Sequence, residues 1–421
     1  MKNFLVLIVT VVGGWAAGSD IPFEVQMGSS FQNDESVIYQ GDGFTIRRRV
    51  DAQDAQFDDL FWINTSDLAG WQNQDFFNGV SVMYRTDKFV IARLSENELM
   101  DLAALQHEAS GACGGIFRLF GDTLPVKGAA AFQPMVDSSK KISKVVSSLE
   151  KVSEANLTEV VEEMAGMTTR DSRLSSRNEV TDFLLRRYES LVPDVRKDVV
   201  IQAYDHGKKT KQNSIIIKIK GAKYPDESVI LGSHIDSINV WRGRAPGADD
   251  NASGTATNLE IFRIIMEEYL VFERTIEIHG YAAEELGLVG SQSIAKAYRQ
   301  AQKKVVSMLQ VDMNLFRSGD VDAIWLISNG TDVDLNRDLV QFGKAYMALP
   351  IKSGVLTSGS SDHAAWSRQG YAVAFPFENP RRMNRKIHTS QDTIANSGAF
   401  SQAALFVKLG LAYLGHYGGL R

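Results

Sequence analysis

The sequence predicts an α/β protein in which an open, mostly parallel mixed sheet carries helices on both faces, preceded by a small α+β region. From residue 135 onwards, short apolar runs typical of buried strands alternate with segments of helical periodicity. Residues 19–134 are instead rich in turns and short strand-like runs, and they end in a linker-like stretch of Gly, Ala and Pro. A chain of 421 residues is long enough for a large core and an accessory region.

The N-terminus has the pattern of an export signal. Lys2 precedes the apolar run Phe4–Val12, which is too short to span a bilayer, and small residues follow at positions 16–18. We therefore expect residues 1–18 to be a signal peptide and the protein to be secreted, either extracellular or periplasmic in transit. Cys113 is the single cysteine, so a disulfide cannot form within the chain.

Charge and hydropathy narrow the range of partners. The net charge is −6 and no dense basic run occurs, so nothing indicates binding to nucleic acid. Beyond the signal, no apolar run reaches the length of a transmembrane helix. We expect a monomer that has neither nucleic acid nor a membrane as partner.

The expected elements follow in chain order. In the first region, the sequence predicts a strand over 88–95, a helix over 96–109 and a strand over 114–120. In the second region, the predicted helices cover 138–167, 178–191, 258–270, 291–303 and 401–417, with one more between 328 and 371. The predicted strands cover 214–221, 227–234, 274–283, 305–313, 323–328 and 371–377.

Histidines and carboxylates gather where the predicted strands end and in the loops between them. These residues are His234, Asp236, Asp249, Asp250, Glu284, Glu285, Asp312, His388 and Asp392. Each by itself has an ordinary explanation as a helix cap, a solvated loop residue or a buried structural histidine. Ligands of open α/β sheets bind beyond the carboxyl ends of the strands, so the joint occurrence favours a metal site. Two histidines and several carboxylates suit Zn²⁺, and the surplus of carboxylates suits two ions sharing a bridging ligand.

Six motifs give this pattern a specific resemblance: HIDS, APGADDNASG, AAEELGLVGSQ, QVDM, SSDHAAW and IHTSQDT. By their order and spacing, residues 156–420 resemble the bacterial leucyl aminopeptidases. These are exported di-zinc exopeptidases, related to glutaminyl cyclases and glutamate carboxypeptidases. The resemblance implies that residues 135–421 form a catalytic domain with the zinc exopeptidase fold and bind two Zn²⁺ per subunit. It also implies peptides with a free N-terminus as substrates, from which the N-terminal residue is hydrolysed.

The resemblance implies a role for each ligand in these motifs. The implied metal ligands are His234, Asp250, Glu285, Asp312 and His388. His234 and Asp312 would hold one zinc ion, Glu285 and His388 would hold the other, and Asp250 would bridge the two.

The catalytic residues implied by the same motifs are Glu284 and Asp236. Glu284 would accept the proton of the attacking water and deliver it to the leaving amine. Asp236 would orient the His234 imidazole. An apolar pocket beside the metals would receive the N-terminal side chain, at the positions Met313, Leu288, Ile327, Phe377 and Ile387. Their apolar character favours Leu or another bulky apolar residue as the one removed.

One stretch departs from the family pattern. Members commonly carry a Cys-x-Gly-Tyr-x-Cys-like stretch before the SDH motif, whereas this chain has LTSGS at Leu356–Ser360. The family disulfide is therefore impossible, and Ser358 replaces the tyrosine that would donate a hydrogen bond to the oxyanion. Catalysis would then depend more on the metals, or on help from Ser361. We expect His363 to be structural.

The region before the catalytic domain resembles the propeptide of the same family over residues 93–120. The implied role is to assist folding and to inhibit the enzyme until it is removed near the linker at 121–134. A permanent accessory domain is the alternative. Two other functions stay open on the same fold: a glutaminyl-peptide cyclotransferase, which uses one zinc, and a non-catalytic binding ectodomain. The complete set of ligands for a second metal argues against the cyclotransferase, and the intact base argues against the ectodomain.

Overall fold

A computed structural model describes residues 23–27, 37–41, 44–48, 59–65, 77, 79–86, 89–110, 116–119, 137–138, 140–174, 176–356 and 360–421. The expected signal peptide, the linker, Cys113 and Ser358 lie outside the described residues. In the part of the chain that is described, no helix combines the length and apolarity needed to cross a membrane.

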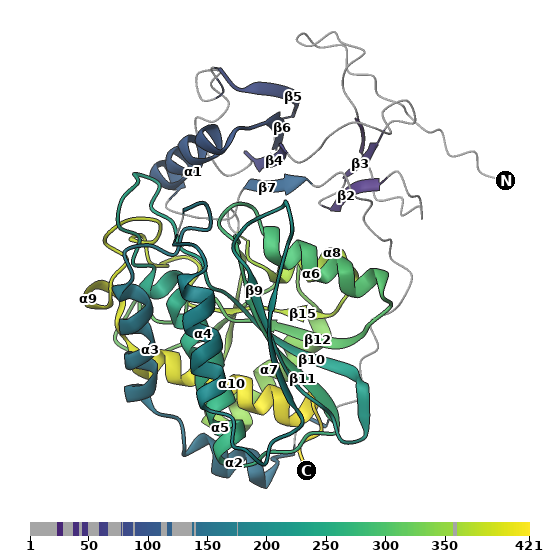
Figure 1. Ribbon diagram of the computed structural model, residues 1–421, viewed down its shortest axis with the longest axis vertical. Coiled ribbons are helices and arrows are strands. Elements are labelled where there is room, and N and C mark those ends of the chain that lie inside the picture. The colour runs from purple at the N-terminus through teal and green to yellow at the C-terminus, as the bar shows by residue number, and fades with distance from the viewer. Residues whose placement is uncertain are drawn as a thin grey trace, which may run out of the picture.

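A mixed sheet of six strands forms the centre of the larger region, as the sequence predicted (Figure 1). Its order is β15 (Val373–Ala374), β12 (Lys304–Gln310), β10 (Tyr224–His234), β11 (Arg274–Tyr281), β9 (Ser214–Ile219) and β8 (Val199–Tyr204). The pairs β15–β12, β12–β10 and β10–β11 are parallel, whereas β9 and β8 extend the sheet in antiparallel fashion. The strand β8 was not predicted.

Helices cover both faces of this sheet, so β9, β10, β11 and β12 are buried along most of their length. One face packs against α2 (Ser143–Leu149), α3 (Glu154–Gly166), α4 (Glu179–Ser190), α5 (Gly254–Glu267), α7 (Val333–Met347) and α10 (Phe400–Tyr417). The other face packs against α6 (Val289–Gln300) and α8 (His363–Arg368). Successive side chains of β9 point to opposite faces of the sheet. Ile215 and Ile217 pack in the core of the first set of helices, and Ile216 packs in the core of the second.

The predicted strand over 371–377 is divided in two. Its first part is β15 in the main sheet, and its second part, β16 (Pro376–Phe377), pairs with β13 (Trp325–Ile327) in a separate small sheet with β14 (Lys352–Gly354). Pro376 has no N–H to donate, so the chain cannot continue the β15 ladder through this residue. The short helix α9 (Ile394–Ser397) follows further along the chain.

The N-terminal region mixes strands and one helix, as expected. One sheet has four strands in the order β5 (Ser81–Arg85), β6 (Phe89–Arg93), β4 (Leu60–Asn64) and β7 (Ile116–Leu119). A second sheet has three strands in the order β1 (Phe23–Met27), β3 (Phe44–Arg48) and β2 (Val37–Gly41). The helix α1 (Glu96–Ser110) begins with Ser95 and Glu98 capping each other's backbone N–H groups. Figure 1 shows this region above one end of the main sheet.

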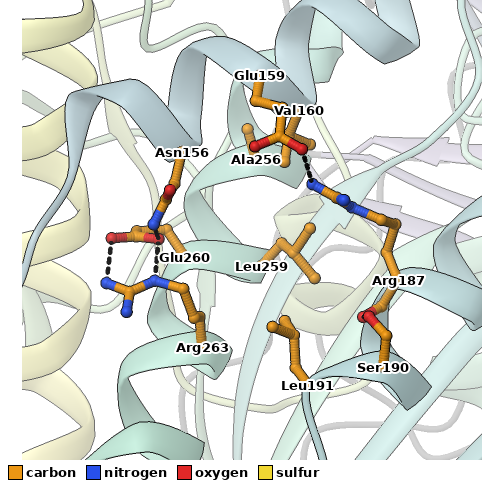
Figure 2. Close-up of a pocket in the computed structure, with 10 residues that line it drawn as sticks. All are labelled: Asn156, Glu159, Val160, Arg187, Ser190, Leu191, Ala256, Leu259, Glu260 and Arg263. Carbon is orange, nitrogen blue, oxygen red and sulfur yellow. Dashed lines mark hydrogen bonds and ion pairs between the residues drawn. The ribbon is translucent and has the colours of Figure 1, made fainter.

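A cavity of about 190 Å³ lies between α3, α4 and α5 (Figure 2). Its charged side chains pair with one another, Glu159 with Arg187 and Glu260 with Arg263. Asn156 donates a further hydrogen bond to Glu260. The cavity therefore presents paired charges around an apolar floor and is a feature of the helix packing.

Candidate metal centre and active site

Three parallel strands bring most of the predicted ligands to one edge of the sheet. His234 is the last residue of β10, and Glu284 and Glu285 follow its neighbour β11. Asp312 comes two residues after β12, the other neighbour of β10. Because parallel neighbours end on the same side, these side chains converge.

The remaining ligands come from two loops that close over this edge. Asp250 lies in the tight turn Ala248–Ser253 before α5, and His388 lies in the loop between β16 and α9. The Asp250–Asn251 peptide bond is cis. Asp392 accepts hydrogen bonds from the backbone N–H groups of Asp249 and Asp250, so it caps the turn and joins neither group of candidate ligands.

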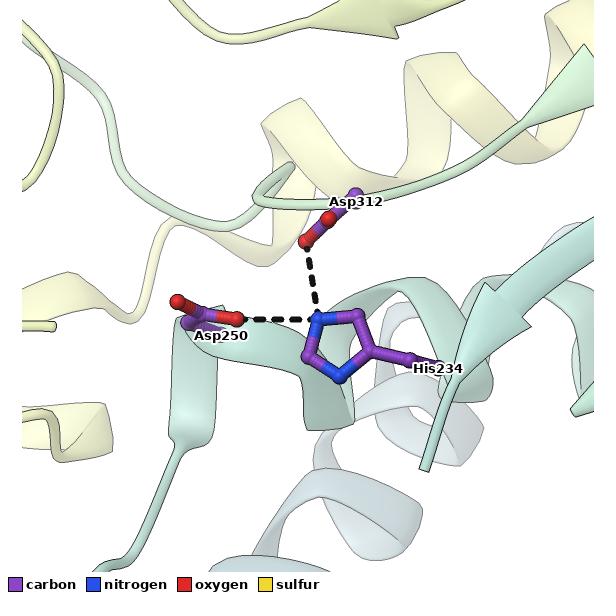
Figure 3. Close-up of side chains that lie close together, drawn as sticks. All are labelled: His234, Asp250 and Asp312. Carbon is purple, nitrogen blue, oxygen red and sulfur yellow. Dashed lines mark ion pairs between the residues drawn. The ribbon is translucent and has the colours of Figure 1, made fainter. Parts of the chain in front are cut away.

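Five side chains form two groups of candidate metal ligands that share Asp250. In the first, His234 Nε2 lies 3.0 Å from Asp250 Oδ1 and 3.5 Å from Asp312 Oδ1 (Figure 3). In the second, His388 Nε2 lies 3.2 Å from Asp250 Oδ2 and 2.8 Å from Glu285 Oε2. The two oxygens of one carboxylate thus face two separate groups, as a bridging ligand requires.

The spacing and chemistry of both groups fit divalent zinc. Ligand atoms about 2.1 Å from a tetrahedral zinc ion lie about 3.4 Å from each other, close to the distances observed here. Asp250 Oδ2, Glu285 Oε1 and Asp312 Oδ1 are buried and have no hydrogen-bond donor among the described residues. Buried carboxylate oxygens without a donor are costly unless a cation binds them.

The electrostatics of the cluster also favour a cation. Burial opposes protonation of His234, but the charges of Asp312 and Glu284 outweigh it and raise the pKa of the imidazole well above its usual value. Burial raises the pKa of the Glu285 carboxyl to about 7, and the charge of Asp250 adds to the shift while that of His388 opposes it. A cluster that attracts protons this strongly has a surplus of negative charge, which divalent ions would neutralise while keeping the carboxylates ionised.

Asp236 lies behind the first group of ligands and connects it to the glutamate loop. Its Oδ1 is 3.5 Å from His234 Nδ1, and its two oxygens accept hydrogen bonds from the backbone N–H groups of Glu284 and Glu285. Asp236 is fully buried. One carboxylate therefore holds the loop that carries Glu284 and also faces the His234 imidazole.

Glu284 is adjacent to Glu285 in sequence but belongs to neither group of ligands. Its residue is 8% exposed. Burial raises the pKa of its carboxyl well above the usual value, and the charge of Glu285 adds to the shift. A buried carboxyl beside a metal site, and not itself a ligand, has the position of a proton carrier.

Ser361 contacts a ligand directly. Its hydroxyl donates to Asp312 Oδ2 at 2.6 Å, and Gln310 Nε2 in turn donates to the Ser361 hydroxyl. These contacts leave Asp312 Oδ1 facing His234. The sequence pattern singled out Ser361 only as a helper of catalysis, and Gln310 carried no signal beyond its place in the QVDM motif.

Four of the five predicted pocket residues lie together. Met313, Ile327, Phe377 and Ile387 form one buried apolar cluster, which also holds Leu356, Phe375 and Met383. Leu288 lies elsewhere, in a cluster with Leu60, Trp62 and Phe89 of the N-terminal region. His363 stacks on Phe375 with 4.6 Å between ring centroids, and burial lowers its pKa to about 3, which is consistent with a structural residue.

Comparisons with known proteins identify the family. The family model described as Peptidase family M28 matches residues 214–406. Leucine aminopeptidase 1 of Uncinocarpus reesii is 34% identical over 274 residues, which cover 61% of this chain and 68% of that protein. The chain belongs to peptidase family M28. Leucine aminopeptidase 1 of Blastomyces gilchristii is also 34% identical, over 59% of this chain and 72% of its own length.

Solved structures agree with this assignment at the level of the fold. The LapA aminopeptidase of Legionella pneumophila superposes with a TM-score of 0.74 at 23% identity, covering 86% of this chain and 98% of that one. A glutaminyl cyclase of Bacteroides thetaiotaomicron superposes with a TM-score of 0.51 at 17% identity, covering 62% and 97%. M28 membership and the leucine aminopeptidase relatives together make the protein a metallo-aminopeptidase of the hydrolase class, and the two groups of candidate ligands fit zinc as its metal.

Proposed function

We propose that this M28 protein is a secreted aminopeptidase that uses two zinc ions and Glu284 to remove bulky apolar N-terminal residues from peptides. The observation that carries the proposal is the pair of ligand groups joined by Asp250, with a buried carboxyl beside them that is not a ligand. Secretion rests on the export signal pattern at residues 1–18.

The chain's own residues have distinct tasks in this reaction. When bound, the two zinc ions polarise the scissile carbonyl and acidify the attacking water. Glu284 accepts the proton from that water and donates it to the leaving amine. Asp236 holds the backbone of Glu284 through a hydrogen bond of 3.0 Å, so the base stays in position through both transfers.

The apolar cluster around Met313 and Phe377 supports a preference for Leu or a similar residue. A pocket lined by these side chains would gain about 0.8 kcal/mol for each methylene that it buries. We expect leucine p-nitroanilide to be hydrolysed at least tenfold faster than the Ala, Lys and Asp derivatives, as kcat/KM. Metal analysis of the same preparation should find two zinc ions per chain. Activity that survives complete removal of metal would contradict the proposal.

A cyclotransferase on the same fold is the second candidate, because the fold is shared with a glutaminyl cyclase. The presence of both ligand groups favours the hydrolase. Incubation with a peptide that begins with Gln separates the two, since a hydrolase releases free Gln and a cyclotransferase releases ammonia from an intact chain. Ammonia release without hydrolysis of leucine p-nitroanilide would favour the cyclotransferase.

We also propose that the N-terminal region inhibits the enzyme until it is removed. This region packs directly on the loop that follows Glu284 and Glu285. Leu286 and Val289 share an apolar cluster with Phe61 and Ile63, and Gln292 Nε2 donates to the carbonyl of Arg118 on β7. Both contacts would restrict access to the site and fix the loop that carries the base.

Limited proteolysis tests the inhibition. Cleavage within 121–134 should raise the kcat/KM for leucine p-nitroanilide at least tenfold, because substrate then reaches the metal centre. The variant Trp62→Ala removes a buried side chain from the interface with Leu288 and should raise the activity of the uncleaved chain. Val333→Asp, at an exposed site on α7, is the control and should leave activity unchanged. Equal activity before and after cleavage would instead favour a permanent accessory domain.

A further inference from the structure

Arg170 is 1% exposed and lies between loops of the metal centre. Its guanidinium donates four hydrogen bonds, all to backbone carbonyls. Nε donates to Ile235 O at 3.0 Å, and Nη2 donates to Gly247 O at 2.9 Å. Nη1 donates to Pro246 O at 2.5 Å and to Met164 O at 3.1 Å.

These carbonyls belong to two segments that carry ligands. Ile235 stands between His234 and Asp236, and Gly247 directly precedes the turn that carries Asp250. The planar fork of a guanidinium can hold several carbonyls in fixed directions, which an ammonium group does less well. The position is tight, because a Cβ added at Gly247 would lie 2.7 Å from Arg170 Nη2. Arg170 therefore fixes the His234 strand end relative to the Asp250 turn.

Gln212 extends this connection to the third segment. It is fully buried, and its Nε2 donates to the carbonyl of Arg170 at 3.0 Å. Its Oε1 accepts a hydrogen bond of 3.1 Å from the backbone N–H of Ala283, the residue before Glu284. The two residues thus connect the segment after β10, the segment after β11 and the turn before α5.

The positive charge of the Arg170 guanidinium suits its place beside the carboxylates of the metal centre. Burial lowers the pKa of Arg170 to about 10, and the charges of Asp392, Asp236 and Asp250 oppose the shift, so the guanidinium stays charged at neutral pH. A buried cation beside a surplus of carboxylates is stabilised by them and offsets part of their mutual repulsion.

We infer that Arg170 and Gln212 form a positioning bracket that holds three segments of the metal centre, those at Ile235, Gly247 and Ala283, at the separation needed to bind both metal ions. Neither residue touches the ligand atoms. The bracket acts through backbone positions, and the inference rests on the two-zinc centre proposed above.

The test compares Arg170→Met and Gln212→Leu with the control Arg196→Met. The Arg196 side chain is 8% exposed, pairs with Asp198 and donates to Ile265 O, so its loss should lower stability alone. Zinc dissociation constants, measured by chelator competition, should rise tenfold to a hundredfold in Arg170→Met and at least fivefold in Gln212→Leu. They should stay within twofold of the parent in the control. The visible spectrum of the cobalt-substituted protein should change in the two bracket variants alone.

Each outcome bears on the inference. Folded Arg170→Met or Gln212→Leu protein with zinc affinity within twofold of the parent overturns the bracket and leaves the proposed function intact. A parent protein that binds no zinc overturns both. Should Arg170→Met fail to fold, Arg170→Lys replaces it, and its zinc affinity is expected between those of the parent and Gln212→Leu. Parent-like affinity in Arg170→Lys together with Gln212→Leu also overturns the bracket.

Discussion

At the scale of single residues, the molecule gives different surroundings to two adjacent glutamates. Both residues lie in the turn that follows β11, where Gly287 N and Leu288 N donate to the carbonyl of Glu284. Glu285 Oε2 lies 2.8 Å from His388 Nε2 inside a ligand group, whereas Glu284 lies outside both groups. The Asp236 carboxylate accepts hydrogen bonds from the backbone N–H groups of both glutamates. Substitution of the two glutamates should therefore have different consequences.

Glu284→Gln should lose turnover and keep its metal. The amide has nearly the same size but cannot accept the proton from water, so kcat should fall by about 10² to 10⁴. KM and the zinc content should stay close to those of the parent. The measurements are steady-state kinetics with leucine p-nitroanilide and metal analysis of the same sample. A variant with near-normal kcat would assign the proton transfer to another group.

Glu285→Gln should weaken one metal site. Replacing a charged ligand with an amide removes part of the attraction for a divalent ion at the group that contains His388. We expect the zinc content to fall from two ions toward one after dialysis, and activity to recover partly with excess zinc. Glu378→Gln, a buried carboxyl outside both groups, serves as a matched control. Unchanged stoichiometry in Glu285→Gln would remove this residue from the ligand set.

At the scale of elements, β11 carries a polar network in its middle and is followed by the loop of Glu284 and Glu285. Glu277 Oε2 accepts hydrogen bonds from Tyr298 of α6 at 2.6 Å and from His279 at 3.0 Å, and Lys218 of β9 forms an ion pair with it. The Tyr281 hydroxyl lies 3.3 Å from His279 Nδ1 and accepts a hydrogen bond from Trp366 Nε1 of α8. The network therefore connects β9 and β11 to both helices on that face.

Glu277→Gln should make this face of the sheet less stable in a way that depends on pH. Burial opposes ionisation of Glu277, but His279, Lys218 and Tyr298 outweigh it and lower the pKa of the carboxyl to about 2. A carboxyl with a lowered folded-state pKa stabilises fully above its unfolded value of about 4.5, and the contribution is lost as the pH falls toward 2. The free energy of unfolding of the variant should be about 2 to 3 kcal/mol lower than that of the parent at pH 7.

Urea unfolding of the metal-free parent and variant measures this difference. It should be constant between pH 6 and 8 and should shrink below pH 4.5, because the unfolded parent then takes up a proton that the folded parent does not. Glu159→Gln, which removes an exposed ion pair with Arg187, is the control and should cost less than about 1 kcal/mol. If the difference in the free energy of unfolding between the parent and Glu277→Gln increased below pH 4.5, it would contradict the assigned direction of the pKa shift.

At the scale of the whole molecule, the fold gathers negative charge at one edge of the main sheet and covers that edge with the N-terminal region. The buried carboxylates repel one another unless cations lie among them. Leu286, Leu288 and Val289 pack against the N-terminal sheets immediately beside these carboxylates. Metal binding and the N-terminal region should therefore both influence the stability of the same loop.

Removal of the metal should destabilise the protein. Each site contributes about 2.7 kcal/mol when free zinc is a hundredfold above its dissociation constant. We expect a chelator to abolish activity and to lower the thermal midpoint by several degrees, with recovery of both on addition of zinc. A calcium-loaded sample controls for non-specific ion effects. If chelation left the midpoint unchanged, the ligand groups would not be binding zinc in the folded protein.

The sequence by itself determined the α/β class, most of the strands and helices of the larger region, and the kinds of side chain that follow each strand. It could do so because apolar periodicity and residue type are local properties of the chain. The tertiary structure decided which carboxylates could serve as ligands. Asp392 caps the turn before Asp250, and Asp236 supports His234 and the glutamate backbone.

Contacts between distant segments account for the remaining differences. Leu288 lies under the N-terminal sheet because β4 and β6 cover its loop, and the run at 371–377 is shared between two sheets because Pro376 ends one ladder. Arg170 carries no motif, yet it joins segments 65 to 77 residues away. Such roles depend on where long-range packing places a side chain, and no local pattern in the chain encodes that position.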